Sequence, residues 1–252
     1  MRYFIELAYN GKNYFGWQRQ PNQISVQEVL ENKLSVILRE KIVIVGAGRT
    51  DTGVHAKQMY AHFDFTGKIE LEKFTFKLNS FLPKDISIYK IFEVEENSHT
   101  RFDASSRAYE YHINLGKNPF LTDSTYQIYH SLDIDKMNEA AKLMFDYTNF
   151  KCFSKSNTDV RTYNCDVMDA IWEKKGNLLI FHVKADRFLR NMVRAIVGTL
   201  LEVGVGKKTV EDFRLVLESK NRREAGTSVP AKGLFLTQII YPYLTPYNNI
   251  AL

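Results

Sequence analysis

The sequence predicts an α+β fold built on a largely antiparallel sheet. Segments with strand-like alternation and segments with helical spacing occur in both halves of the chain, without the strict β–α–β order of a doubly wound parallel sheet. No low-complexity segment or short tandem repeat interrupts them. At 252 residues the chain is long enough for a sizeable core, in one large domain or in two of ordinary size.

The first half mixes strands and helices. Its expected strands are the apolar or aromatic runs 2–9, 42–45, 58–65 and 86–94. After a polar loop over residues 10–24, Ser25 and Glu28 form a capping-box pattern that opens a helix, and a second helix is expected near residues 70–80. The apolar positions of the first helix repeat at helical spacing and are Val26, Val29, Leu30, Leu34, Ile37 and Leu38.

The second half follows the same plan. Its expected strands are residues 107–115, about 163–173, 178–186 and 234–241. Helices are expected over residues 133–145 and 188–203, and another after the capping pair Thr209 and Asp212. The halves meet near residues 100–106, so we expect two tightly packed units, residues 1–105 and 106–252.

Composition and charge narrow the class of protein. The chain is 44% hydrophobic and 25% charged, which is typical of a soluble globular protein. Its net charge of +5 permits a polyanionic partner without requiring one. No apolar run reaches the roughly 18 residues of a membrane span, and the first residues include Glu6 but no signal-peptide core. We therefore expect a cytoplasmic protein with no membrane partner. Cys152 and Cys165 lack CxxC spacing and are expected to be free thiols rather than zinc ligands.

The most informative segment is residues 46–56, Gly-Ala-Gly-Arg-Thr-Asp-Thr-Gly-Val-His-Ala. Its glycines allow sharp turns and the close approach of a ligand. Asp51 could be a nucleophile, a general base, a metal ligand or a turn residue. The tripeptide that begins at Asp51 also matches the aspartic-protease signature, but those enzymes need two carboxylates that share a proton. The chain has no second such tripeptide, and Arg49 favours the ionised carboxylate.

Two further patterns allow a functional and a structural interpretation. His55 and His62 with nearby aspartates could indicate a metal site, yet their spacing fits no common zinc motif. On a helix over residues 188–203 and its approach, three arginines would lie within roughly 60° of one another, at about 100° per residue. These arginines, which form either a solvated face or an RNA contact, are Arg187, Arg190 and Arg194.

Residues 48–56 resemble the GRTDAGVHA motif of the TruA-type tRNA pseudouridine synthases, and only Thr52 departs from it, where alanine is usual. Further segments resemble that family in the same order along nearly the whole chain. They are residues 9–18 (with Asn10 for the usual aspartate), 25–28, 99–102, 107–111, 188–194 and 225–234.

The resemblance implies a role for four residues. Asp51 would be the catalytic nucleophile, and Arg49 would contact RNA and help to flip the target base. Tyr109 would contact that base, and Arg194 would pair with Asp51. It also implies that two similar α/β halves share one large sheet, with the active-site cleft between them.

The resemblance further implies that the substrate is tRNA, modified at uridines 38, 39 and 40 of the anticodon stem-loop by a homodimer. The reaction is an isomerisation, so neither a cofactor nor a metal is expected. A catalytically silent RNA-binding protein on the same scaffold is the alternative, and the presence of Asp51 favours the enzyme. Basic residues that could contact RNA are Arg187, Arg190, Lys207, Lys208, Arg222 and Arg223.

Overall fold

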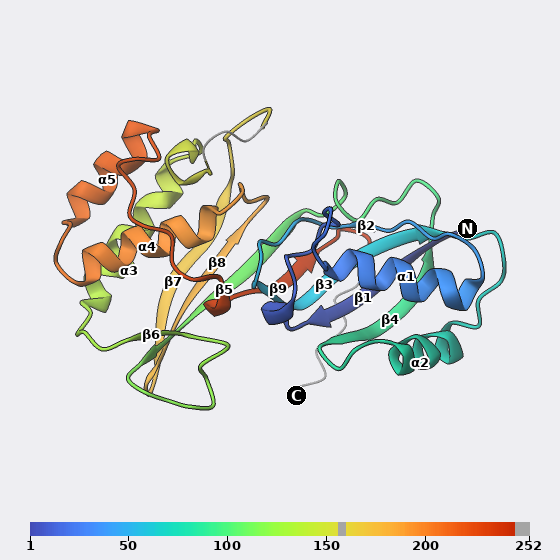
Figure 1. The fold of residues 1–252 in the computed structure, drawn as a ribbon. Coiled ribbons are helices and arrows are strands. Elements are labelled where there is room, and N and C mark those ends of the chain that lie inside the picture. The colour runs from blue at the N-terminus through green and yellow to red at the C-terminus, as the bar shows by residue number, and fades with distance from the viewer. Residues whose placement is uncertain (156–159, 245–252) are drawn as a thin grey trace. The chain divides into compact units, whose positions relative to one another are not determined.

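The computed structural model describes residues 1–155 and 160–244. Within them, nine strands form one sheet in the order β4-β1-β3-β9-β5-β8-β7, with β2 beside β3 and β6 beside β5 (Figure 1). The strands are β1 (Arg2–Tyr9), β2 (Val45–Gly46), β3 (His55–Asp64), β4 (Ile86–Val94), β5 (Ser106–Leu115), β6 (Tyr126–Ile128), β7 (Val167–Lys175), β8 (Leu178–Ala185) and β9 (Leu234–Ile240). The β1–β3, β1–β4, β2–β3 and β7–β8 pairs are antiparallel, whereas β5–β6 is parallel. The predicted α+β class with a mostly antiparallel sheet is confirmed.

The chain divides into two compact units. The first contains Met1–Arg107 and the chain from Thr237 onward, and the second contains Ala108–Leu236. Both boundaries fall inside strands, because Arg107 lies in β5 and Thr237 lies in β9. The last strand therefore returns the chain to the first unit.

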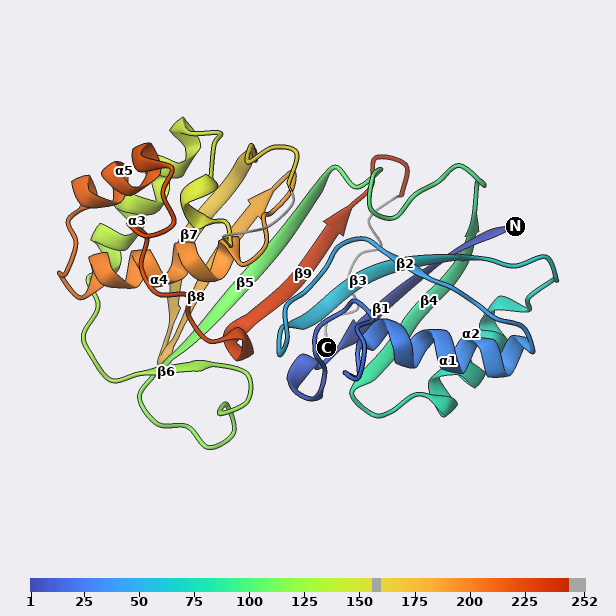
Figure 2. The same cartoon turned by 45° about the horizontal axis from the view of Figure 1, so that its top comes forward.

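In the first unit, helices α1 (Val26–Leu38) and α2 (Leu71–Phe81) lie on one face of the strands (Figure 2). Helix α1 begins where the capping pattern predicts, because the Ser25 hydroxyl accepts a hydrogen bond from Glu28 N at 3.2 Å. The helix buries one apolar stripe against the sheet, and the predicted positions that are fully buried are Val26, Leu30 and Leu34.

In the second unit, helices α3 (Ile134–Lys142), α4 (Met192–Gly204) and α5 (Val210–Ser219) pack against one another, and α3 lies along β7 (Figure 1). Most of α4 is buried, and a loop crosses it closely. A Cβ atom at Gly198 would lie 1.9 Å from Thr227 O, so that position requires glycine. Short 3-10 turns cover Gly11–Asn13, Leu143–Asp146, Lys151–Phe153 and Ala231–Gly233.

Of the strand predicted over residues 42–45, only the last residue belongs to β2. Backbone amides of this segment donate to side chains of α1 instead of to a neighbouring strand. Ile42 N donates to Ser35 Oγ at 2.9 Å, and Ile44 N donates to Glu31 Oε1 at 3.1 Å. The apolar character of the segment therefore reflects packing against the helix rather than pairing in the sheet.

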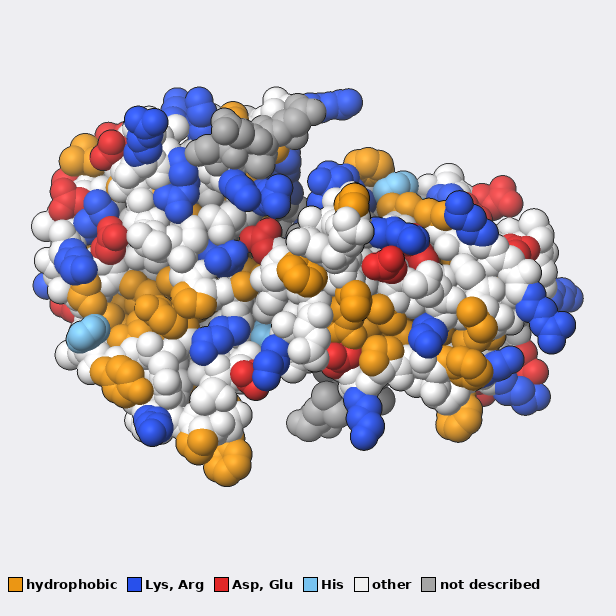
Figure 3. All heavy atoms as spheres, in the orientation of Figure 1, with side chains coloured by type: hydrophobic (Ala, Val, Ile, Leu, Met, Phe, Trp, Pro, Cys, Tyr) orange, Lys and Arg blue, Asp and Glu red, His pale blue; other side chains and the backbone are white. Residues whose placement is uncertain are grey.

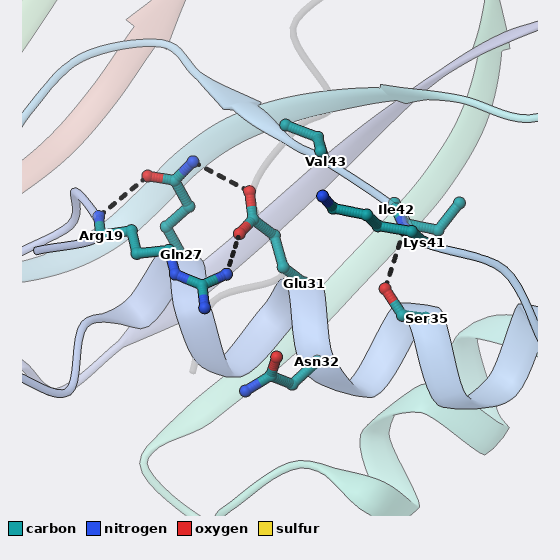
Figure 4. Close-up of a pocket in the computed structure, with 8 residues that line it drawn as sticks. All are labelled: Arg19, Gln27, Glu31, Asn32, Ser35, Lys41, Ile42 and Val43. Atoms are coloured by element: carbon teal, nitrogen blue, oxygen red, sulfur yellow. Dashed lines mark hydrogen bonds and ion pairs between the residues drawn. The ribbon is translucent and has the colours of Figure 1, made fainter. Parts of the chain in front are cut away.

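Glu31 is a buried carboxylate that organises this contact. It accepts hydrogen bonds from Gln27 Nε2 at 3.0 Å and from Arg19 Nη1 at 3.3 Å (Figure 4). A buried charge is tolerated when donors surround it in this way. Figure 4 shows these side chains around a hollow between α1 and the segment that leads into β2.

Other predicted boundaries also differ. The helix predicted over residues 188–203 begins only at Met192, because Asn191 is left-handed with a φ of 66°. The helix predicted to end at Phe145 ends at Lys142 and continues as a 3-10 turn. Strand β6 was not predicted; at three residues it is too short to show an alternating pattern.

None of the helices in the described part of the chain has both the length and the apolar content to cross a bilayer. Lys and Arg side chains are spread over the face shown in Figure 3 and do not form a single patch there. Cys152 and Cys165 are buried free thiols, and burial raises the pKa of both to about 12. Neither thiol is therefore suited to form a reactive thiolate.

Candidate active site

Asp51 lies in a loop that connects two antiparallel strands, β2 and β3. Ala47 N donates to Tyr60 O at 2.8 Å and extends the pairing past the end of β2. The chain turns back at Gly53, where φ is 77°, and Val54 N donates to Asp51 O at 3.1 Å. The main chain on both sides of Asp51 is therefore held by hydrogen bonds.

The end of β1 and the segment that follows it brace this loop. The Tyr9 hydroxyl lies 2.9 Å from Thr50 Oγ1, and Trp17 N donates to Thr50 O at 3.3 Å. On the other side of the carboxylate, Gly53 N donates to Tyr14 O at 3.2 Å. Residues 9–17 thus fix the loop from one end to the other.

Two glycines allow this close approach. Gly16 has a φ of 85°, and a Cβ atom there would lie 2.3 Å from Thr50 O. A Cβ atom at Gly11 would lie 1.9 Å from Val54 O, and Gly11 N donates to His55 Nδ1 at 3.1 Å. No larger side chain fits at either position without moving the loop.

Residues 99–107 hold the stem of the loop from another direction. Thr100 Oγ1 donates to Val45 O at 2.9 Å, and Arg107 Nη2 donates to Ala47 O at 3.2 Å. Both acceptors belong to the short segment that leads into the loop. The Asp51 loop is therefore supported by two separate segments of the same unit.

Both histidines near the loop are buried. His55 accepts a backbone hydrogen bond, and His62 Nδ1 lies 2.8 Å from Thr100 Oγ1. Burial, together with the positive charges of Arg2 and His99, lowers the pKa of His62 to about 4. In the part of the chain that the structure describes, no group of three or more His, Cys, Asp or Glu side chains could hold a metal ion. These histidines have structural contacts.

The loop presents two charged side chains of opposite sign. Asp51 is half-buried, whereas Arg49 is exposed. Because the main chain between them is held by hydrogen bonds, the two side chains start from fixed points of the loop. This arrangement can place an acid next to a substrate while a cation contacts a neighbouring anionic group.

In the second unit, Tyr109 is a half-buried residue of β5. Its ring meets the Phe188 ring edge to face, with centroids 5.1 Å apart and an interplanar angle of 86°. Edge-to-face pairs contribute about 0.5–1.5 kcal/mol beyond their buried area. This contact therefore orients the Tyr109 ring while leaving part of it accessible.

Arg194 lies in the first turn of α4 and binds the loop that crosses the helix. Arg194 Nε donates to Val229 O at 2.7 Å, and Val229 N donates to Arg194 O at 3.2 Å. The next carbonyl of the loop, Pro230 O, accepts from the Tyr111 hydroxyl at 2.8 Å. Burial raises the pKa of Tyr111, and the nearby Arg194 charge opposes that rise. One guanidinium is thus held beside a buried tyrosine and a fixed loop.

A model of the tRNA pseudouridine synthase family matches residues 7–103 and 140–242. These ranges include the Asp51 loop and the bracing residues 9–17 in the first unit, and α4 with its crossing loop in the second. The chain belongs to the tRNA pseudouridine synthase family. The resemblance drawn from the sequence motifs is confirmed. The protein is therefore an isomerase of this family, and its substrate is tRNA.

Relatives match over almost their full length. A tRNA pseudouridine synthase A of Parabacteroides distasonis is 53% identical over 242 residues, which cover 96% of both chains. One from Bacteroides fragilis is 52% identical over 243 residues, with 96% of both chains covered. One from Clostridium acetobutylicum is 41% identical over 239 residues, which cover 94% of this chain and 98% of that protein.

The prediction that three arginines form a stripe on one helix of this pseudouridine synthase is wrong. Arg187 and Arg190 precede α4, and only Arg194 lies in it. Asn191 is left-handed, so helical spacing does not apply across it. Arg190 is exposed and Arg187 is half-buried.

The remaining basic residues predicted to contact RNA have different surroundings. Arg222 donates to Ala225 O at 3.2 Å, to Gly226 O at 3.1 Å and to Ser228 Oγ at 2.9 Å. Its guanidinium therefore organises the crossing loop. Lys208 Nζ lies 3.8 Å from Glu202, whereas Lys207 and Arg223 are exposed.

Sequence reasoning missed the residues that support the loop. Arg107 and Thr100 bind main-chain carbonyls of its stem and Tyr9 binds the Thr50 side chain, but none of the three lies within residues 46–56. The sequence assigned Tyr9 and Arg107 to strands and all three segments to family motifs, without a role in supporting the loop. A polar side chain in a segment otherwise predicted to be strand or core was the available signal.

Proposed function

We propose that this pseudouridine synthase modifies uridines 38, 39 and 40 in the anticodon stem-loop of tRNA, with Asp51 as the nucleophile. The observation that carries the proposal is the construction of the Asp51 loop. Two segments and two obligatory glycines hold the loop that carries one half-buried carboxylate. Catalytic groups need such preorganisation, because a small misplacement can cost about a hundredfold in rate.

The chemistry needs no external reactant. The N1–C1′ bond of the target uridine breaks, the uracil turns over, and a C5–C1′ bond forms. The hydrogen on C5 is released to solvent as a proton, and N1 acquires one in the product. A carboxylate nucleophile can form a covalent intermediate that retains one fragment until the new bond forms.

The target base must leave the RNA stack before Asp51 can reach it. In this proposal the exposed Arg49 occupies the space that the base vacates or binds the adjacent phosphate. Tyr109, oriented by Phe188, contacts the flipped base. Arg194 pairs with Asp51, because the fork of a guanidinium matches a carboxylate.

Action at three adjacent positions requires recognition of shape and phosphates rather than of base identity. The exposed basic residues Arg190, Lys207 and Arg223 suit that purpose better than Arg222, whose guanidinium binds its own loop. We further propose that the enzyme acts as a homodimer in the cytoplasm. Sedimentation of the purified protein with and without tRNA would test the dimer.

The test uses tRNA that carries tritium at C5 of uridine. The wild-type protein should release tritium to water from a tRNA with uridine at positions 38–40 and not from one that lacks uridine there. Asp51→Asn should bind the same tRNA and release no label. Asp135→Asn, which removes an exposed carboxylate from α3, should behave like the wild type.

Two outcomes would contradict the proposal. If Asp51→Asn retained the wild-type rate, Asp51 would not be the nucleophile. If the wild-type protein released label only from uridines outside positions 38–40, the assigned target would be wrong although the family reaction would stand.

A further inference from the structure

The turn formed by residues 99–103, here called the 99–103 turn, is a surface turn of the first unit that several hydrogen bonds hold. Asp103 N donates to His99 O at 3.1 Å, and His99 N donates to Asp103 Oδ2 at 2.7 Å. The His99 ring accepts two more hydrogen bonds at Nδ1, from Arg101 N at 3.1 Å and Phe102 N at 3.3 Å. Side chains at both ends of the turn therefore satisfy its backbone.

The 99–103 turn presents an aromatic ring and a cation to solvent. The Phe102 side chain is 74% exposed, and its ring centroid lies 4.3 Å from that of His99. The Arg101 guanidinium carbon lies 5.6 Å from the centroid of the Phe102 ring. Beneath this pair, His99 packs on the buried His62 ring at 4.8 Å. The exposed ring therefore rests on a series of rings that continues into the core.

The same turn is joined to the Asp51 loop. Arg107 donates from Nη2 to Arg101 O at 2.6 Å and to Ala47 O at 3.2 Å, so one guanidinium bridges the turn and the loop stem. Thr100 Oγ1 adds the bond to Val45 O at 2.9 Å. Ala47 is four residues before Asp51 in the chain. The exposed ring is therefore held in a fixed relation to the stem of the catalytic loop.

We propose that the 99–103 turn is an additional RNA-binding element of this enzyme. Phe102 stacks on a base that neighbours the target and becomes unstacked when the target is extruded, and Arg101 binds an adjacent phosphate. The inference rests on the proposed action on tRNA. An exposed aromatic with a cation beside it is the combination that binds single-stranded nucleic acid without reading its sequence.

Stacking suits this substrate because every base offers a π-face. An enzyme that acts at three adjacent positions meets a different neighbouring base each time, and hydrogen-bond readout would reject some of them. A surface that binds a protein partner would present a broader apolar patch. Here a single exposed ring lies beside the positive charge of Arg101. The opposite charge of RNA phosphates therefore complements this surface.

The test compares four variants in tRNA binding and in single-turnover tritium release. Phe102→Ala should weaken tRNA binding about tenfold, within the range for one stacked base, while Phe102→Trp should bind at least as well as the wild type. Arg101→Gln should reduce the salt dependence of binding by about one phosphate contact. Phe76→Ala is the matched control, because Phe76 is 80% exposed on α2. It should change neither measurement.

Affinity for Phe102→Ala within twofold of the wild type would overturn the proposal, and so would an equal loss for Phe102→Ala and Phe76→Ala. Far-UV circular dichroism checks that each variant is folded, and the tryptophan and glutamine variants test the proposal independently of the alanine variant. The two proposals fail differently. A wild-type protein that releases no tritium from any tRNA contradicts the proposed function, whereas normal release by Phe102→Ala with unchanged binding contradicts only this inference.

Discussion

The hydroxyl of Tyr9 lies 2.9 Å from the hydroxyl of Thr50, and this buried contact ties the end of β1 to the residue before Asp51. The hydrogen bond joins a core strand to the Asp51 loop. It therefore links the fold of the first unit directly to the position of Asp51, the proposed nucleophile.

Removal of this contact should lower activity more than stability. Tyr9→Phe and Thr50→Val should each destabilise the protein by about 1 kcal/mol, the usual value for one buried hydrogen bond. The single-turnover rate should fall about tenfold or more, because the loop then samples positions in which Asp51 is misplaced. Thr50→Ser keeps the hydroxyl and should retain most of the rate. A rate loss no larger than the stability loss would show that the contact only supports the fold.

Gly16 should tolerate substitution less well than another glycine with similar backbone geometry. Gly16 has a φ of 85° and no room for a Cβ atom, whereas Gly206 has a φ of 74° with no atom within 4 Å of a built Cβ. Gly206→Ala should therefore cost only the left-handed strain, about 1 kcal/mol. Gly16→Ala should cost more in urea unfolding and should also abolish tritium release, because the clash moves Thr50 O. Equal costs for the two variants would show that the loop yields easily.

Stability should fall as the pH is lowered from about 6.5 to about 4, and His62 should contribute to that fall. Its pKa in the folded protein is lowered to about 4 by burial and by the charges of Arg2 and His99. The unfolded chain therefore binds a proton at higher pH than the folded protein does, and acid favours unfolding in this window. At about 1.4 kcal/mol per pH unit, the loss is roughly 2–3 kcal/mol over this range.

The measurement is the free energy of unfolding from pH 4 to pH 7 for His62→Gln beside the wild type. The variant should be less stable at pH 7 and should lose less stability on acidification. His130→Gln, which removes an exposed histidine, should keep the wild-type slope. Parallel slopes for all three proteins would exclude His62 as the source.

Arg194→Lys should lower the rate of isomerisation although it keeps the positive charge. A lysine cannot donate to Val229 O and also present a guanidinium fork to a carboxylate. We expect at least a tenfold loss in single-turnover rate with a small change in tRNA affinity. Arg39→Lys, at an exposed position after α1 that has no proposed role in RNA binding, is the control and should keep the wild-type rate. A loss of stability with an unchanged rate would assign Arg194 to the α4 loop contact alone.

Local sequence signals predicted the elements that have strong patterns. Strands β1 and β4 have the predicted bounds, and α1 starts after Ser25 because its hydroxyl caps the helix. Sequence patterns gave wrong predictions where contacts with distant residues, rather than local preferences, set the backbone conformation. The segment before β2 binds Glu31 and Ser35 of α1 instead of a strand, and Asn191 interrupts a helix that its apolar spacing predicts.

The sequence by itself determined the family, the reaction class and the Asp51 loop, because the residues of this motif are contiguous and its glycines have a local purpose. Only the tertiary structure decided which residues hold that loop. Arg107 and Tyr9 are 56 and 42 residues from Asp51 in the chain, yet both bind the main chain or side chain of its loop. Hydrogen bonds between such distant residues depend on strand order and register, which no local pattern encodes.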